Sequence, residues 1–398
     1  MSQSTTDDRR PTTDERGARV VVAMSGGVDS SLAAALLVDA GYDVVGVSMR
    51  LWEGSAGATE SGCCSLDDFL DARRVAEQLG IPFYVMDFRA EFGRAVVDEF
   101  VAEYRRGRTP NPCARCNQFV KFAALWDRAR ELGAALIATG HYARVRVGAD
   151  GAALLRGVDA DKDQSYFLFG VDPAVLRCTR FPVGEMRKAE VRAAAERRGL
   201  PVARKPDSQE VCFAPRSAYM AFVAQRASAE PLRPGVVVDE RGAVLARHDG
   251  VHRFTIGQRR GLGVSGGAAR YVTAIDAEAG VVRVGSGDQV AARGLVASGA
   301  NWLGDVPLPG ARVEVKIRSR FAAQAAQVVR ADVDGFELAA AEGMRAVTPG
   351  QAAVLYDGER VIGGGWIERA TAVGGSPLPD SPPFAEGLTG EGTLDDRR

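Results

Sequence analysis

Residues 20–31 read VVVAMSGGVDSS, and this stretch decides the fold of the first half of the chain. Its first five residues are all apolar, which is typical of a parallel strand buried on both faces. Ser25, Gly26 and Gly27 interrupt the run, and the residues from Asp29 predict a helix that ends near Gly41. Backbone N–H groups and the helix dipole converge on such a turn, so it predicts an anion-binding loop in which Asp29 caps the helix or holds Mg²⁺.

The alternation of strand and helix continues to about residue 140. Apolar runs at 43–49, 81–88 and 135–139 predict further strands, and helical patterns cover 69–79, 92–106 and 119–132. This order predicts a parallel α/β sheet with helices on both faces.

The pattern changes after about residue 220. Turn dipeptides such as Pro234-Gly235, Asp249-Gly250 and Asp334-Gly335 separate short apolar runs, which is typical of β-rich modules. We therefore expect five parts in chain order: a disordered leader (1–18), an α/β domain (19–222), a central β-rich domain (223–292), a C-terminal β-barrel (293–372) and a disordered tail (373–398).

Composition restricts the class of protein. The chain has 398 residues, of which 46% are hydrophobic and 25% charged, as in ordinary globular proteins. No apolar run reaches the roughly 18 residues of a membrane span, and residues 1–19 are too charged for a secretory signal, so a cytoplasmic protein is expected.

Net charge is −1, but charge is unevenly distributed. Residues 177–205 hold 9 Lys/Arg and 3 acids, a net of +6, and residues 253–270 and 316–330 each hold 4 basic residues and no acid. These stretches are either a basic face for a polyanion or ordinary solvated surfaces.

Six cysteines lie at 63, 64, 113, 116, 178 and 212, and in a cytosolic chain they suggest thiol chemistry or metal binding. Cys113 and Cys116 lie in a segment, 107–117, whose two prolines predict a loop, and Cys212 lies in a second loop, 205–213. Neighbouring basic side chains would lower the thiol pKa in both loops; these are Arg108, Arg115, Lys121, Arg204 and Lys205.

A four-thiolate metal site made by Cys63, Cys64, Cys113 and Cys116 is the alternative, although two adjacent cysteines fit one tetrahedral ion poorly. Cys178 is expected to be inert.

The glycine loop lacks the Lys-Ser/Thr ending of a Walker loop and the spacing of a dinucleotide turn. It resembles the Ser-Gly-Gly-x-Asp-Ser loop of the ATP pyrophosphatase (PP-loop) enzymes. That resemblance implies binding of the pyrophosphate end of ATP and adenylation of a substrate oxygen.

Six segments together resemble the bacterial tRNA-specific 2-thiouridylase family: 24–31, 108–117, 139–142, 161–167, 205–213 and 252–262. The resemblance implies a PP-loop domain of the adenine nucleotide alpha hydrolase type, ATP with Mg²⁺, and a tRNA substrate. It also implies a sulfur-donor protein of a cysteine-desulfurase relay. In that reaction the C2 oxygen of the wobble uridine is adenylated and then replaced by sulfur.

The resemblance also assigns residues. Cys212 matches the cysteine that carries the persulfide, and Cys116 matches the partner that closes a disulfide with it. The ATP-binding positions are Ala23, Met24, Ser25, Gly26, Gly27, Val28, Asp29, Ser30, Met49 and Gly140. The tRNA-contacting positions are Asn111, Pro112, Cys113, Lys162, Asp163, Gln164, Arg318 and Ser319.

Two positions depart from the family pattern. Some members carry Asp in place of Cys113, which puts the proton-transfer group in question. Ser319 stands where some relatives have an aromatic residue, so base stacking is not expected there.

Two other function classes stay open from the residues alone. A PP-loop ligase or amidotransferase acting on a small metabolite would use the same glycine loop but would need neither Cys116 nor Cys212. A non-catalytic RNA-binding protein would use the cysteines as metal ligands.

Overall fold

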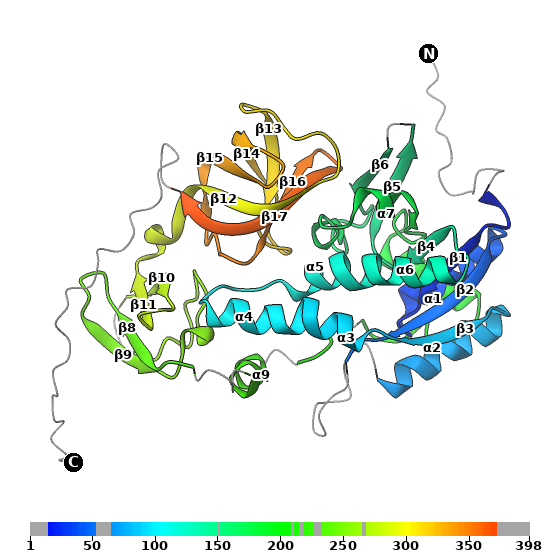
Figure 1. Cartoon of the computed structure of the whole chain (residues 1–398), viewed down its shortest axis with the longest axis horizontal. Coiled ribbons are helices and arrows are strands. Elements are labelled where there is room, and N and C mark those ends of the chain that lie inside the picture. Colours follow the sequence, from blue (N-terminus) through cyan, green and yellow to red (C-terminus); the bar gives the residue numbers. More distant parts are fainter. Residues whose placement is uncertain are drawn as a thin grey trace.

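A computed structural model describes residues 15–52, 65–149, 151–207, 211–214, 218–226, 232–264 and 268–371. Cys63, Cys64, the first fourteen residues of the expected leader and the expected tail lie outside these ranges. Figure 1 shows an α/β part, a small β module and a barrel, arranged around long helices that run through the middle of the molecule. The positions of the domain boundaries stay predictions.

The α/β part is built on a five-stranded parallel sheet of order β3-β2-β1-β4-β7. Strand order reverses at β1, so β1 lies between β2, which follows it in the chain, and β4. Ligands of such sheets bind at the carboxyl ends of the strands beside this reversal. The strands are β1 (Arg19–Ala23), β2 (Asp43–Arg50), β3 (Phe83–Asp87), β4 (Leu136–Thr139) and β7 (Thr179–Arg180).

The side chains of consecutive β1 residues pack into two different apolar clusters. Val20 and Val22 pack in an apolar cluster with helices α1, α2 and α8, whereas Val21 belongs to a second cluster with α4, α5 and α6. All three side chains are fully buried. The apolar run thus marks a strand covered by helices on both faces, as predicted.

Helices on the sheet are α1 (Val28–Asp39), α2 (Leu66–Leu79), α7 (Pro173–Arg177) and α8 (Lys188–Arg197). Residues 89–105 form one continuous helix, made of α3 (Arg89–Phe92), a π-helical stretch η2 (Gly93–Asp98) and α4 (Glu99–Arg105). Residues 112–131 form another, made of α5 (Pro112–Cys116), π-helical η3 (Asn117–Ala124) and α6 (Leu125–Glu131). Among the described residues, no helix is long and apolar enough to cross a membrane.

Two local predictions need correction. The segment that contains Cys113 and Cys116 is helical from Pro112, because proline suits the first helical position and the Asn111 side chain accepts a bond from the Ala114 N–H at 3.2 Å. Within the expected leader, Glu15 pairs with Arg180 and Tyr42, so order begins earlier than predicted.

A four-stranded sheet of order β10-β11-β8-β9 forms the central module. Its strands are β8 (Gly235–Val238), β9 (Val244–His248), β10 (Tyr271–Asp276) and β11 (Val281–Gly285), and α9 (Tyr219–Arg226) precedes them. Short 3₁₀ turns are η4 (Ser165–Phe167), η7 (Val251–Arg253) and η8 (Gly287–Val290).

Six strands in the order β12-β15-β14-β13-β16-β17 close into a barrel, because β17 also pairs with β12. Unexpectedly, a hairpin of the α/β part joins this sheet: its strand β6 pairs with β17, and β5 follows. The bounds are β5 (Ala143–Gly148), β6 (Gly151–Arg156), β12 (Ala291–Trp302), β13 (Arg312–Lys316), β14 (Gln324–Ala331), β15 (Gly335–Arg345), β16 (Ala352–Asp357) and β17 (Arg360–Thr371).

Arg156 fastens the hairpin to the barrel. Its guanidinium bonds Glu314 at 2.9 Å and the Gly358 carbonyl at 3.1 Å, and it lies 4.0 Å from the centre of the Tyr356 ring. The Arg156 side chain, which is 26% exposed, thus combines charge-assisted hydrogen bonds with a cation–π contact. These contacts join the hairpin to the barrel.

We expect Arg156→Ala to lower the local opening free energy of this seam by about 1–2 kcal/mol, because these contacts are lost together. Amide hydrogen exchange in β6 and at the start of β17 should then accelerate about 5- to 30-fold. Arg146→Ala, an exposed arginine on the same hairpin, is the matched control and should leave exchange unchanged. Equal acceleration in both variants would contradict the assignment.

Candidate nucleotide and cysteine site

The glycine loop lies at the carboxyl end of β1, where strand order reverses. Its turn is closed by serine hydroxyls: Ser30 Oγ accepts from the Ser25 N–H at 3.1 Å, and Ser31 Oγ donates to the Gly27 carbonyl at 2.8 Å. Helix α1 begins directly after the loop, at Val28. The N–H groups of its first turn are therefore available to an anion.

Two glycines allow neighbouring elements to approach the loop. A Cβ on Gly26, whose φ is +71°, would lie 2.3 Å from the Asp68 carbonyl oxygen at the start of α2. A Cβ on Gly140, just past β4, would lie 2.5 Å from the Ser30 nitrogen. The loop is thus enclosed by the starts of α1 and α2 and by the end of β4.

Asp29 does not cap α1, contrary to one of the two expectations. The N-cap is Gly27, which makes no side-chain cap bond. Instead the Asp29 carboxylate accepts from Tyr142 Oη at 2.7 Å and from Lys188 Nζ at 2.8 Å on each oxygen. Burial and the bond to Asp29 raise the pKa of Tyr142, which keeps its hydroxyl protonated as a donor.

The structure brings together the predicted ATP-binding positions. Residues Ala23–Ser30 form the loop, Gly140 packs against it, and Met49 lies buried on the adjacent strand β2. These positions lie near the edge where the parallel strands end, and their role in binding ATP stays a prediction.

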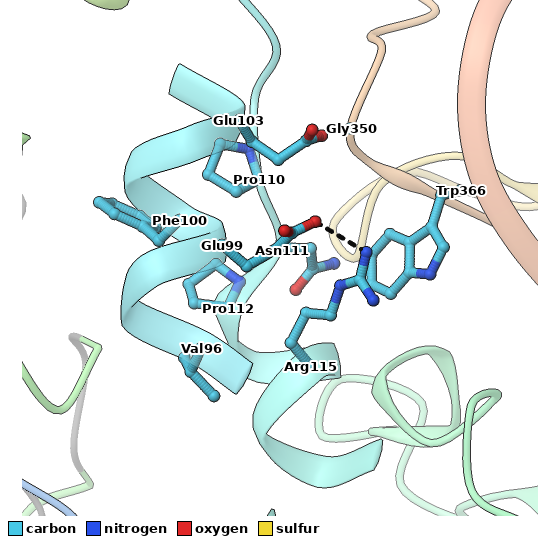
Figure 2. Close-up of a pocket in the computed structure, with 10 residues that line it drawn as sticks. All are labelled: Val96, Glu99, Phe100, Glu103, Pro110, Asn111, Pro112, Arg115, Gly350 and Trp366. Atoms are coloured by element: carbon cyan, nitrogen blue, oxygen red, sulfur yellow. Dashed lines mark hydrogen bonds and ion pairs between the residues drawn. The ribbon is translucent and has the colours of Figure 1, made fainter. Parts of the chain in front are cut away.

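Cys116 is the last residue of α5 and is only 5% exposed, whereas Cys113, one turn earlier, is exposed. A small pocket lies beside this helix, between α4 and the barrel, and Phe100, Asn111, Pro112 and Trp366 are among its lining residues (Figure 2).

Arg115 connects the cysteine-bearing helix to both walls of this pocket. Figure 2 shows its guanidinium between Glu99 of α4 and Trp366 of β17. The distances are 3.0 Å to Glu99 Oε1 and 4.2 Å to the centre of the Trp366 ring. The barrel therefore contacts α5 directly.

Cys212 is half-buried, and its neighbour Phe213 anchors it. The Phe213 ring lies 5.0 Å from Phe100 and 6.3 Å from Trp52, which follows β2. Phe213 and Cys116 belong to one apolar cluster. Phe213 thus packs against α4 and against the residue that follows β2, in the same apolar cluster as Cys116.

Four of the five basic side chains near the two cysteine segments form ion pairs with carboxylates, and the lowered thiol pKa expected from them stays a prediction. The pairs are Arg108 with Glu103 and Glu368, Arg115 with Glu99, Arg204 with Glu196, and Lys205 with Asp68 and Asp71. Their charge is therefore balanced within the protein.

The expected tRNA-contacting residues fall in three places. Asn111, Pro112 and Cys113 start α5 beside the pocket. Lys162, Asp163 and Gln164 form the turn before η4. Lys162 forms an ion pair with Asp207 at 2.9 Å. The Asp163 carboxylate accepts hydrogen bonds from the Gly157 and Ser165 N–H groups, and the Gln164 side-chain oxygen accepts one from the Tyr142 N–H.

The third place is the barrel, where Arg318 and Ser319 follow β13. The Arg318 guanidinium donates to Thr348 Oγ1 at 2.6 Å and to the Ile256 carbonyl at 3.3 Å. It thus joins the barrel to the central module, and burial lowers its pKa.

Among the described residues, no group of three or more His, Cys, Asp or Glu side chains is arranged to hold a metal ion. Cys63 and Cys64, two members of the alternative four-thiolate site, lie outside these residues. His141, another candidate near the nucleotide, instead packs between Phe122 and Phe181 and bonds Thr139 Oγ1 at 2.7 Å. Burial lowers its pKa to about 3.

Comparison with protein families covers most of the chain. Residues 18–216 match the tRNA methyl transferase HUP domain, residues 221–286 the tRNA methyl transferase PRC-barrel domain, and residues 292–367 the aminomethyltransferase beta-barrel domain.

Curated relatives are similar over nearly their whole length. A tRNA-specific 2-thiouridylase MnmA of Geotalea uraniireducens is 49% identical over 88% of this chain and 95% of its own length. One of Geobacter metallireducens is 49% identical over 91% of this chain and 100% of its own. This chain belongs to the tRNA-specific 2-thiouridylase family. Among solved structures, a 4-thiouridine synthetase–RNA complex with bound ATP aligns at 16% identity and a TM-score of 0.32, over 54% of each chain.

Two residues that connect the motifs, Lys188 and Asp207, are not singled out by the sequence. The one signal is an acid in a basic neighbourhood, Asp207 two residues after Lys205. Its partners Lys162, Lys188 and Arg192 lie up to 45 residues away, and Lys188 in turn pairs with Asp29 across 159 residues.

Gly26→Ala tests the enclosed loop. The new methyl group would collide with the Asp68 carbonyl, so we expect ATP affinity, measured with Mg²⁺ by calorimetry, to fall about tenfold or more, which is about 1.4 kcal/mol. Gly80→Ala is the matched control: Gly80 has a φ of +67° and open space around it, so the strain is similar but nothing clashes. An equal loss of affinity in both variants would show that strain alone is responsible.

Proposed function

We propose that this protein thiolates C2 of the wobble uridine of tRNA, with ATP as activator and a persulfide on Cys212 as sulfur source. The observation that carries this proposal is that a glycine loop at the carboxyl edge of the parallel sheet belongs to the same domain as Cys116 and Cys212, and that Cys116 and Phe213, the neighbour of Cys212, share one apolar cluster. Membership of the thiouridylase family supports the substrate.

ATP would bind with its pyrophosphate on the glycine loop and the first turn of α1. The residues proposed for it are Ala23, Met24, Ser25, Gly26, Gly27, Val28, Asp29, Ser30, Met49 and Gly140. Asp29 is placed to hold Mg²⁺ once Lys188 gives way. The uridine C2 oxygen attacks the α-phosphorus and pyrophosphate leaves, which turns a poor leaving group into AMP.

Sulfur transfer then needs two cysteines. The terminal sulfur of the Cys212 persulfide attacks C2 and displaces AMP, which leaves Cys212 joined to the base through a disulfide. The Cys116 thiolate attacks Cys212 Sγ, so the thiocarbonyl departs with the electron pair and a Cys116–Cys212 disulfide remains. A thiol reductant and a sulfur-donor protein restore the persulfide for the next cycle.

Recognition of the RNA would combine backbone contacts with capture of an unstacked loop base. Asn111 and Pro112 border the pocket and Cys113 follows them on α5, and we assign all three to the base. Lys162, Asp163 and Gln164, with Arg318 and Ser319 on the barrel, are assigned to the surrounding RNA. We assign the reaction to the cytoplasm, in keeping with a tRNA substrate.

The decisive experiment is nucleoside analysis of tRNA incubated with the protein, ATP, Mg²⁺ and a persulfide donor. Cys212→Ser should abolish 2-thiouridine formation while tRNA-dependent pyrophosphate release persists, because adenylation precedes sulfur transfer. Cys116→Ser should be equally inactive in thiolation, and Cys113→Ser should only be impaired.

Cys178→Ser is the control and should behave as wild type, since that cysteine lies outside both loops. Thiolation by Cys212→Ser would refute the persulfide assignment. Pyrophosphate release that ignores tRNA would instead favour a metabolite-directed PP-loop enzyme.

A further inference from the structure

Arg115 precedes Cys116 at the end of α5 and lies between two other elements of the protein (Figure 2). Its Nη2 atom bonds Glu99 Oε1 of α4 at 3.0 Å, and the guanidinium lies 4.2 Å from the centre of the Trp366 ring on β17. Only 24% of the Arg115 side chain is exposed, so water competes weakly for these contacts. A planar guanidinium can bond through its edge and stack through its face at the same time.

π-Helical turns lie beside both partners of the Arg115–Glu99 pair. The stretch η3 begins at Asn117, directly after Cys116, and η2 on the facing helix ends at Asp98, directly before Glu99. A π-helical turn replaces the i→i+4 bonds of the α-helix by i→i+5 bonds and is found mostly at functional sites. The five-residue α5 therefore depends more on tertiary contacts for its orientation, and the Glu99–Arg115 pair is one of them.

The start of α5 is held by other contacts. The Thr109 N–H donates to the Pro349 carbonyl of the barrel at 2.9 Å, and the Asn111 side chain caps the helix with a bond of 3.2 Å. Loss of the Arg115 side chain would therefore leave this segment docked on the barrel. The end that it releases is the other end of α5, where Cys116 lies.

We propose that Arg115 is a positioning residue that orients Cys116 for the second half of sulfur transfer. The inference rests on the proposed function, in which the Cys116 thiolate attacks Cys212 Sγ. The bond from that sulfur to the base sulfur then breaks, and its electron pair leaves with the base. Displacement at sulfur requires the attacking atom to approach opposite the bond that breaks, so a small rotation of α5 slows this step. Adenylation and formation of the carbon–sulfur bond come earlier and do not use Cys116.

A single-turnover reaction separates these steps. The protein is loaded with cysteine persulfide, freed of excess donor and mixed with tRNA, ATP and Mg²⁺ without reductant. Pyrophosphate, 2-thiouridine and the protein–tRNA adduct on a non-reducing gel are followed in the same samples.

In Arg115→Ala we expect pyrophosphate at the wild-type rate, a persistent adduct, and release of 2-thiouridine about tenfold slower or more, as for a misplaced reactive group. Dithiothreitol should then release 2-thiouridine from the adduct, because an external thiol takes the place of Cys116.

Trp366→Leu removes the stacking face and should slow the same step. The double variant should be no slower than Arg115→Ala alone, because both changes remove the same contact. Arg128→Ala is the matched control: this arginine lies on α6, farther along the same helix, pairs with Glu131 and should behave as wild type. Thermal unfolding checks that each variant is folded.

Wild-type release of 2-thiouridine by Arg115→Ala would overturn the positioning role alone, as would a loss of pyrophosphate release together with thiolation in the folded variant. If the wild-type protein itself formed neither adduct nor 2-thiouridine, the proposed function would fail, and the inference with it.

Discussion

The reversal of strand order at β1 is the constraint on which the rest of the structure depends. It opens the carboxyl edge of the sheet between β1 and β4, so the glycine loop has space in front of it. Trp52 after β2, Gly140 after β4 and the start of α2 all reach the same edge. Several loops meet at this edge because parallel strands all end on one side.

Much of this architecture follows from sequence patterns, because local signals were strong. The apolar run at 20–24, the glycine turn and the alternation that follows predict the parallel sheet, and the turn dipeptides after residue 220 predict β modules. Each feature is set by residues within one or two elements. The two separate cysteine segments are also evident from the sequence. The helix that begins at Pro112 is not, because proline is as common in loops as at the first position of a helix.

What could not be predicted depends on pairs of residues distant in sequence. Lys188 contacts Asp29 across 159 positions, and Arg108 contacts Glu368 across 260. A basic stretch in isolation looks like a surface for a polyanion; here several of its charges are matched by acids of other elements. The hairpin β5–β6 likewise has an ordinary strand pattern, and nothing in it specifies that its partner lies in the barrel.

During synthesis, the β5–β6 hairpin is made long before the strand that pairs with it. Strand β6 ends at Arg156, and the strand that pairs with it, β17, begins at Arg360, 204 residues later. At a synthesis rate of about 5–20 residues per second, the edge of the hairpin waits on the order of 10–40 s on the ribosome before its partner emerges. The same strand closes the barrel against β12. The junction between the α/β part and the barrel is thus completed only when β17 has been synthesised, and a chain truncated before β17 would leave three strand edges, on β6, β12 and β16, exposed to aggregation.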